Sequence, residues 1–181
     1  MGVAAHPHPP LRGARLGSLV GVVGGLVFVL VNAGPLPGST AWRVAGVAAA
    51  IGVVVLSLTR PAPADAEPSR AALRTYLLSV GAMVVAVPAG SAVLRAVDQQ
   101  DLVLPWVVAV VGLHFVPFAA AFTAPVFRVL GLALVAIAVA GVVAGLAGWS
   151  DAAAATGLAA GFALLVAAGA PYARTRPATP R

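Results

Sequence analysis

The chain has 181 residues, of which 61% are hydrophobic and only 9% are charged. An ordinary soluble domain is about 45–50% apolar and about 25% charged, and a single soluble core of this size cannot hide so much apolar surface from water. Disorder requires low hydrophobicity and high charge, so it is excluded as well. The composition therefore predicts a polytopic membrane protein in contact with a lipid bilayer, and its long apolar runs predict an all-α fold.

Six apolar runs follow one another along the chain, separated by breaks rich in Gly, Pro, Asn and Asp. A spanning helix needs about 20 mostly apolar residues. The predicted spans are residues 16–34, 41–59, 75–94, 102–122, 129–148 and 152–172. They form a single six-helix transmembrane domain, residues 16–172, arranged as three helical hairpins. Residues 1–15 and 173–181 are predicted to be disordered cytoplasmic segments.

All eleven basic residues are Arg, and their distribution predicts the orientation of the chain. If the N-terminus lies in the cytoplasm, Arg43 and Arg95 fall outside. The Arg residues that then lie inside are Arg12, Arg15, Arg60, Arg70, Arg74, Arg128, Arg174, Arg176 and Arg181. Short loops with such an Arg excess are cytoplasmic under the positive-inside rule. We therefore expect both termini inside, and we expect the first run to be retained because it is too long for a cleaved signal peptide.

Residue types exclude several kinds of site and partner. There is no Cys, which excludes disulfides, thiolate metal sites and Cys nucleophiles. There is no Lys, which excludes a phosphate-binding loop of the P-loop type. The absence of Lys beside abundant Arg, Ala and Gly also indicates a high-GC bacterial genome, actinobacterial in particular, and thus a bacterial plasma membrane. The Arg residues are not gathered with aromatic residues, so no nucleic-acid partner is expected, and no cofactor is expected.

Small residues recur at intervals of four in several spans. Such residues allow helices to approach closely in a bilayer, where no hydrophobic effect drives the helices together. The candidate packing residues are Gly17, Gly21, Gly25, Gly141, Gly145, Gly157 and Gly161. They serve either the packing of a six-helix bundle within one chain or a homo-oligomer of the G-x-x-x-G type. We favour the first interpretation because Gly and Ala are abundant throughout the sequence.

His114 is the only ionisable residue deep inside a predicted span. It lies about 18 Å from the outer end of its helix, and an ionisable residue at that depth is a candidate functional site. Pro117 leaves the carbonyl of Leu113 without its helical donor and predicts a kink. His114 either makes an interhelical hydrogen bond to a Ser, a Thr or a carbonyl, which we favour, or takes part in ligand binding or proton transfer. A metal site is disfavoured because no second ligand lies at that depth.

The stretch Gly112-Leu113-His114-Phe115-Val116-Pro117-Phe118-Ala119 has the pattern G-x-H-F-x-P-x-A. In this stretch the chain resembles small uncharacterised multi-pass membrane proteins of bacteria, actinobacteria in particular, that carry the motif in a middle helix. The resemblance covers residues 112–119 and otherwise depends on the number of spans. It implies no particular activity, but it directs attention to His114 and Pro117 as a candidate intramembrane polar site.

The sequence favours a non-enzymatic function. It contains no metalloprotease or hydrolase motif, and its loops are too short to carry a soluble active site. The first hypothesis is an integral membrane protein with a structural or accessory role. The second is a permease or channel subunit for a small solute or for protons, which uses His114 in a kinked helix. We favour the first because transporters usually carry more buried polar groups.

Overall fold

The computed structural model of the protein describes residues 12–60, 69–122 and 124–173. These residues form six α-helices and one 3-10 turn, and they contain no strand. The helices are α1 (Arg12–Asn32), α2 (Ser39–Thr59), α3 (Arg70–Ala96), α4 (Val103–Ala121), α5 (Pro125–Leu146) and α6 (Ala152–Ala173), and the turn η1 (Gln100–Leu102) precedes α4. The prediction of an all-α fold is confirmed.

The outer surface of the helices has the chemistry of a lipid-facing surface. Helices α2 to α6 are each long and apolar enough to cross a membrane, and the apolar part of α1, Gly17–Asn32, is shorter. Large apolar side chains are exposed, among them Leu58 at 70%, Leu78 at 69% and Val166 at 72%. Exposing such side chains to water is unfavourable, whereas hydrocarbon accommodates them. The protein is therefore a helical, multi-pass membrane protein.

Four helices begin earlier in the chain than the predicted spans, and the smallest shift is that of α2, which begins at Ser39 rather than at residue 41. Helix α3 begins at Arg70 rather than at residue 75, because Ser69 caps it by accepting a hydrogen bond from the Ala72 N–H at 3.1 Å. Helix α5 begins at Pro125 rather than at residue 129, since proline suits the first helical position, where its fixed φ is helical and its missing N–H would have had no helical acceptor. Helix α1 begins at Arg12, within the segment 1–15 predicted to be disordered. The predictions for residues 1–11 and 174–181 lie outside the described residues.

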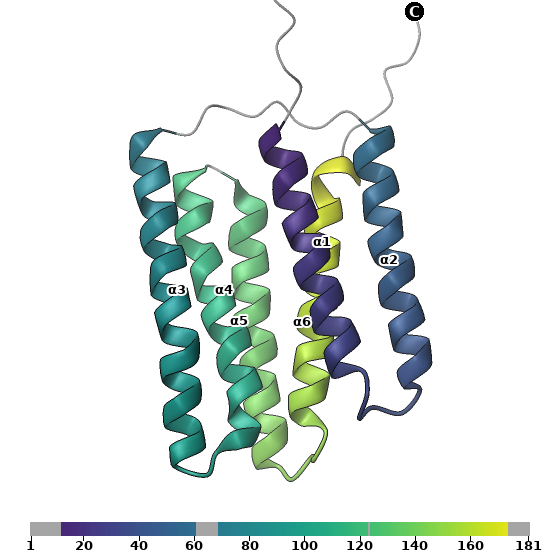
Figure 1. The fold of residues 1–181 in the computed structure, drawn as a ribbon, viewed down its shortest axis with the longest axis vertical. Helices are drawn as coiled ribbons and strands as arrows, with labels where there is room; N and C mark the ends of the chain where they lie inside the picture. The colour runs from purple at the N-terminus through teal and green to yellow at the C-terminus, as the bar shows by residue number, and fades with distance from the viewer. Residues whose placement is uncertain (1–11, 61–68, 123, 174–181) are drawn as a thin grey trace, which may run out of the picture.

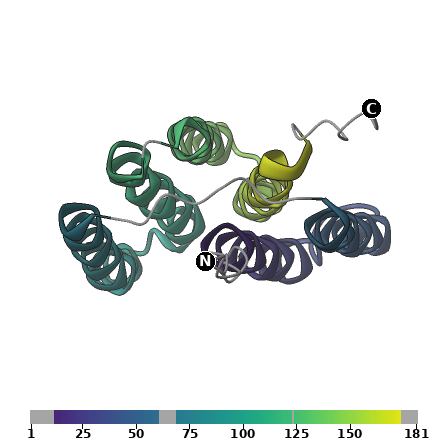
Figure 2. The same ribbon diagram turned by 90° about the horizontal axis from the view of Figure 1, so that it is seen from above.

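The helices alternate in direction, so that α1, α3 and α5 begin at one end of the bundle and α2, α4 and α6 begin at the other (Figure 1). Helix α6 contacts α1, α2, α4 and α5. Seen from above, α2 and α3 lie at opposite edges of the bundle (Figure 2). Helix α3 packs almost entirely on α4 and η1. Thus α6 joins the pair α1–α2 to the group α3–α4–α5.

The alternating directions sort charged and aromatic residues between the two ends. At the end where α1, α3 and α5 begin, which we call the Arg-rich end, the charged residues of the described ranges are Arg12, Arg15, Arg60, Arg70, Arg74 and Arg128. The opposite end, which we call the Trp end, carries Arg43, Arg95, Asp98, Asp101 and Asp151, and also Trp42, Trp106 and Trp149. All acidic residues within the described ranges therefore lie at the Trp end.

Glycine pairs bring two helix pairs into backbone contact. A Cβ added at Gly25 of α1 would lie 2.8 Å from the carbonyl oxygen of Gly161 in α6, and one at Gly161 would lie 2.7 Å from that of Gly25. Gly112 and Gly131 pair α4 with α5 in the same way, at 2.8 Å and 2.6 Å. No side chain larger than hydrogen fits at these crossings. Apolar clusters fill the space around them, one between α1, α2 and α6 and the other between α4, α5 and α6.

Most of the other candidate packing glycines also contact neighbouring helices of the same chain. Gly21 faces Ala168, Gly157 faces Asn32 and Gly141 faces Thr156. Gly145 has ordinary contact with Ala152, at 3.9 Å from an added Cβ. Gly17 differs, because nothing lies within 4 Å of a Cβ placed there. The four-residue spacing thus corresponds mainly to contacts between helices of one chain.

Candidate functional site

His114 lies on the side of α4 that faces α3, seven residues before the end of its helix. This places it about 10 Å from the Arg-rich end of α4 at 1.5 Å per residue. The Oγ atom of Ser79 in α3 lies 2.9 Å from His114 Nδ1 and 3.0 Å from the His114 carbonyl oxygen. One serine therefore contacts both the ring and the backbone of His114.

The two contacts of Ser79 restrict where the protons lie. A serine hydroxyl has one proton to donate. If it donates that proton to the His114 carbonyl, the contact with the ring is a hydrogen bond only when Nδ1–H donates to Oγ. The imidazole is then the Nδ1–H tautomer, and Nε2 keeps a lone pair. If the hydroxyl instead donates to Nδ1, the proton of the neutral ring lies on Nε2. Only the first arrangement satisfies both contacts at once.

An aromatic cluster surrounds His114 and connects three helices. The ring centroid of His114 lies 4.5 Å from that of Phe118 and 5.3 Å from that of Phe115. Phe118 stacks on Tyr76 of α3 at 5.1 Å, and Phe115 stacks on Phe127 of α5 at 5.8 Å. These rings fill the space between α3, α4 and α5 at the level of the histidine. The aromatic residues near His114 therefore serve packing between helices.

Pro117 lies within α4, and the helix continues through it to Ala121. Because proline has no N–H, Pro117 cannot donate to the carbonyl of Leu113. The Leu113 side chain is 58% exposed, so this part of the helix faces outward. The structure places Pro117 close to His114 along α4, but Ser79, rather than the proline, supplies the polar contact of the imidazole.

A second hydrogen bond joins α3 and α4 near the Trp end. The Trp106 Nε1–H donates to the carbonyl oxygen of Ala86 at 3.1 Å. The indole ring lies directly against Gly90, where an added Cβ would collide with it. Helix α3 is therefore held to α4 by two polar contacts, Ser79 with His114 and Trp106 with Ala86.

Three other buried hydroxyl groups, those of Ser18, Ser57 and Thr156, donate to backbone carbonyls. Ser18 of α1 donates to the carbonyl of Ala168 in α6 at 3.0 Å, which adds a polar contact to that helix pair. Ser57 donates to Val54 and Thr156 donates to Ala152, each within its own helix. In the part of the chain that the structure describes, no group of three His, Cys, Asp or Glu residues could hold a metal ion.

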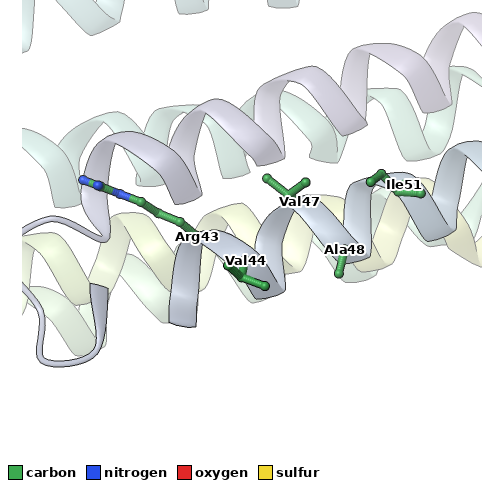
Figure 3. Close-up of a pocket in the computed structure, with 5 residues that line it drawn as sticks. All are labelled: Arg43, Val44, Val47, Ala48 and Ile51. Atoms are coloured by element: carbon green, nitrogen blue, oxygen red, sulfur yellow. The ribbon is translucent and has the colours of Figure 1, made fainter. Parts of the chain in front are cut away.

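A shallow concavity on the outer face of α2 lies far from His114 in the fold. Arg43, Val44, Val47, Ala48 and Ile51 line it, and all of them belong to α2 (Figure 3). The Arg43 side chain extends toward the turn between α1 and α2, where its Nη2 would lie 3.4 Å from a Cβ added at Gly34. Because one helix supplies all the lining residues, the concavity resembles an exposed apolar strip more than an enclosed binding site.

Sequence reasoning identified His114 but missed Ser79, Tyr76 and Phe127 as its surroundings. Ser79 is 35 residues away in the chain, and no spacing rule connects the two residues. The two residues do lie at similar depths in the bundle, and this is the one signal that could have paired them. Ser79 lies nine residues from the Arg-rich end of α3, and His114 lies seven residues from that end of α4. No known family model matches the chain, and no curated protein or solved structure matches it either.

Proposed function

We propose that the protein is a non-enzymatic integral membrane protein with a structural or accessory role. The backbone contact of the glycine pairs Gly25–Gly161 and Gly112–Gly131 carries this proposal. Apolar clusters fill the space around these pairs, and the buried hydroxyl groups of Ser18, Ser57 and Thr156 donate to backbone carbonyls. An interior of this kind suits a stable scaffold in the bilayer better than one that opens to admit a solute.

The proposal includes six spans, with both termini on the cytoplasmic side of a bacterial plasma membrane. The apolar part of helix α1, Gly17–Asn32, is about 24 Å long at 1.5 Å per residue, which is shorter than the hydrocarbon thickness of about 30 Å. A bilayer accommodates a short span by local thinning and by flanking side chains that reach the interface, as that of Arg15 can do here. The gathering of Arg residues at the Arg-rich end supports its cytoplasmic placement under the positive-inside rule. The Arg-only basic composition supports the bacterial origin.

The topology predicts opposite labelling of two single-cysteine variants, Ala71→Cys and Gln99→Cys. Both positions are exposed, and the native chain has no Cys to interfere. Gln99 is preferred to Asp98, whose φ of 57° is unfavourable for most side chains. A membrane-impermeant maleimide added to intact cells should label Gln99→Cys at once and Ala71→Cys only after permeabilisation. The native protein, which has no Cys, is the negative control. Labelling of both variants from the same side would refute the topology.

An alternative function, also a proposal, is a permease or channel subunit for protons or a small solute. One observation favours it: the arrangement that satisfies both Ser79 contacts leaves a lone pair on Nε2 of His114 within the membrane. A neutral imidazole of this kind can accept a proton or a hydrogen bond from a solute. Pro117 supplies a place where α4 can bend.

Proton flux into liposomes separates the structural or accessory role from a proton permease. The structural or accessory role predicts that liposomes containing the native protein take up protons no faster than empty liposomes, as read by an internal pH-sensitive dye. A permease predicts faster uptake that is lost in His114→Phe and kept in the control Leu113→Phe, whose side chain faces outward. Fast uptake with this pattern would overturn the structural role in favour of the permease.

A further inference from the structure

A groove at the Arg-rich end lies between the last turns of α4 and the first turns of α5. It is lined by Val116, Ala119, Ala120, Pro125 and Arg128. Ala120, Pro125 and Arg128 are exposed, and Val116 is 38% exposed. Val116 lies five residues before the end of α4, so the apolar wall reaches about 7 Å into the membrane below that end. The groove thus combines one guanidinium group at its rim with small apolar side chains below.

The described charged residues at this end of the bundle have one sign. Within residues 12–60, 69–122 and 124–173, the charged residues at the Arg-rich end are all Arg. The acidic residues of the same ranges, Asp98, Asp101 and Asp151, lie at the Trp end. An anion that approaches Arg128 therefore meets attraction without competition from a neighbouring carboxylate of these ranges. Guanidinium groups bind phosphate strongly because their planar N–H groups match its oxygens.

We propose that this groove binds an anionic phospholipid, with the lipid phosphate on Arg128 and an acyl chain along Val116, Ala119 and Ala120. Basic sites between transmembrane helices on the cytoplasmic side suit anionic headgroups, and the apolar wall suits a hydrocarbon chain. The inference uses the proposed orientation, in which the Arg-rich end faces the anionic cytoplasmic leaflet. Lipid binding is measured in detergent, where the orientation of the protein plays no part. The lipid-binding proposal can therefore be refuted while the proposed topology stands, and the reverse is also possible.

Native mass spectrometry of the purified protein with added phosphatidylglycerol or phosphatidylcholine tests the proposal. The native protein should retain phosphatidylglycerol in preference to phosphatidylcholine. Arg128→Gln should lower the retention of phosphatidylglycerol about fivefold, which is the effect expected of one Arg at an anionic surface. Ala120→Phe keeps the charge but fills the groove, so it should lower the retention of both lipids. Both side chains are exposed, and unchanged melting temperatures will show that the variants fold.

Arg43→Gln is the matched control. It removes the same charge beside an apolar strip, but at the Trp end and on a single helix (Figure 3), so retention of phosphatidylglycerol should not change. Equal retention of the two lipids by the native protein would overturn the proposal. An equal loss in Arg43→Gln and Arg128→Gln would overturn it as well, because net charge would explain both. Displacement of phosphatidylglycerol by inorganic phosphate, or full retention in Ala120→Phe, would overturn the role of the acyl chain.

Discussion

Replacing Gly25 with Ala should destabilise the protein by about 1–3 kcal/mol, the usual cost of overpacking a well-packed interior. The added Cβ would lie 2.8 Å from the carbonyl oxygen of Gly161 and 2.9 Å from Cγ of Leu165. The carbonyl belongs to helix backbone and cannot rotate away, so α1 and α6 must move apart. Because α6 contacts four other helices, the cost should appear in global unfolding, measured by denaturant titration in mild detergent.

The neighbouring residue supplies the control, because Gly24→Ala should have the opposite sign. Nothing lies within 4 Å of a Cβ at Gly24, and Ala is favoured over Gly in a helix by about 0.5–1 kcal/mol. Equal stability of the two variants would contradict the contact between α1 and α6. Light scattering tests the other interpretation. If Gly25→Ala converts an oligomer to monomers and the monomer loses no stability, the face of α1 that carries Gly21 and Gly25 serves a homo-oligomer.

Replacing Gly90 with Ala should release α3 from the bundle while the other helices stay packed. The Cβ would collide with the Trp106 indole, which must turn away and lose its hydrogen bond to the Ala86 carbonyl. Repacking of this kind costs about 1–3 kcal/mol. Helix α3 packs almost entirely on α4 and η1, so the damage should be local. Hydrogen exchange followed by mass spectrometry should show faster exchange in α3 and unchanged exchange in α6.

Gly81→Ala is the matched control on the same helix, since nothing lies within 4 Å of a Cβ there. It should leave the exchange of α3 unchanged or slow it slightly. If Gly90→Ala also leaves α3 protected, the Trp106 contact does not hold this helix. If exchange rises equally in all six helices, the bundle unfolds as one unit and the division at α3 is wrong.

Local properties of the chain were predictable from the sequence. The apolar runs predicted the helices because the length of a spanning helix follows from bilayer thickness. The role of Ser69 as a cap was also predictable, since a cap involves only residues a few positions apart. The spacing of Gly21 and Gly25 indicated a packing face because four-residue intervals lie on one side of a helix. None of these patterns identifies the partner helix.

Contacts between helices far apart in the chain were not predictable. Gly112 and Gly131 meet in the structure, yet neither has a small residue four positions away within its helix, and a crossing needs only one glycine on each side. The partner of His114 was expected to be a Ser, a Thr or a carbonyl, but its identity as Ser79 depends on α3 lying beside α4. The rotation and neighbours of each helix decide such pairs, and one sequence alone carries no record of them.

The central position of α6 has a consequence for biosynthesis. Among the six helices it is the last to leave the ribosome, yet it makes the contacts that join α1 and α2 to α3, α4 and α5. Until α6 enters the bilayer, Gly21 and Gly25 of α1 lack the helix that packs on them in the finished bundle. The earlier helices must therefore wait in the membrane as two partial assemblies, and a ribosome that stalls before Ala152 leaves a product that quality-control proteases can recognise by its unpaired helix faces.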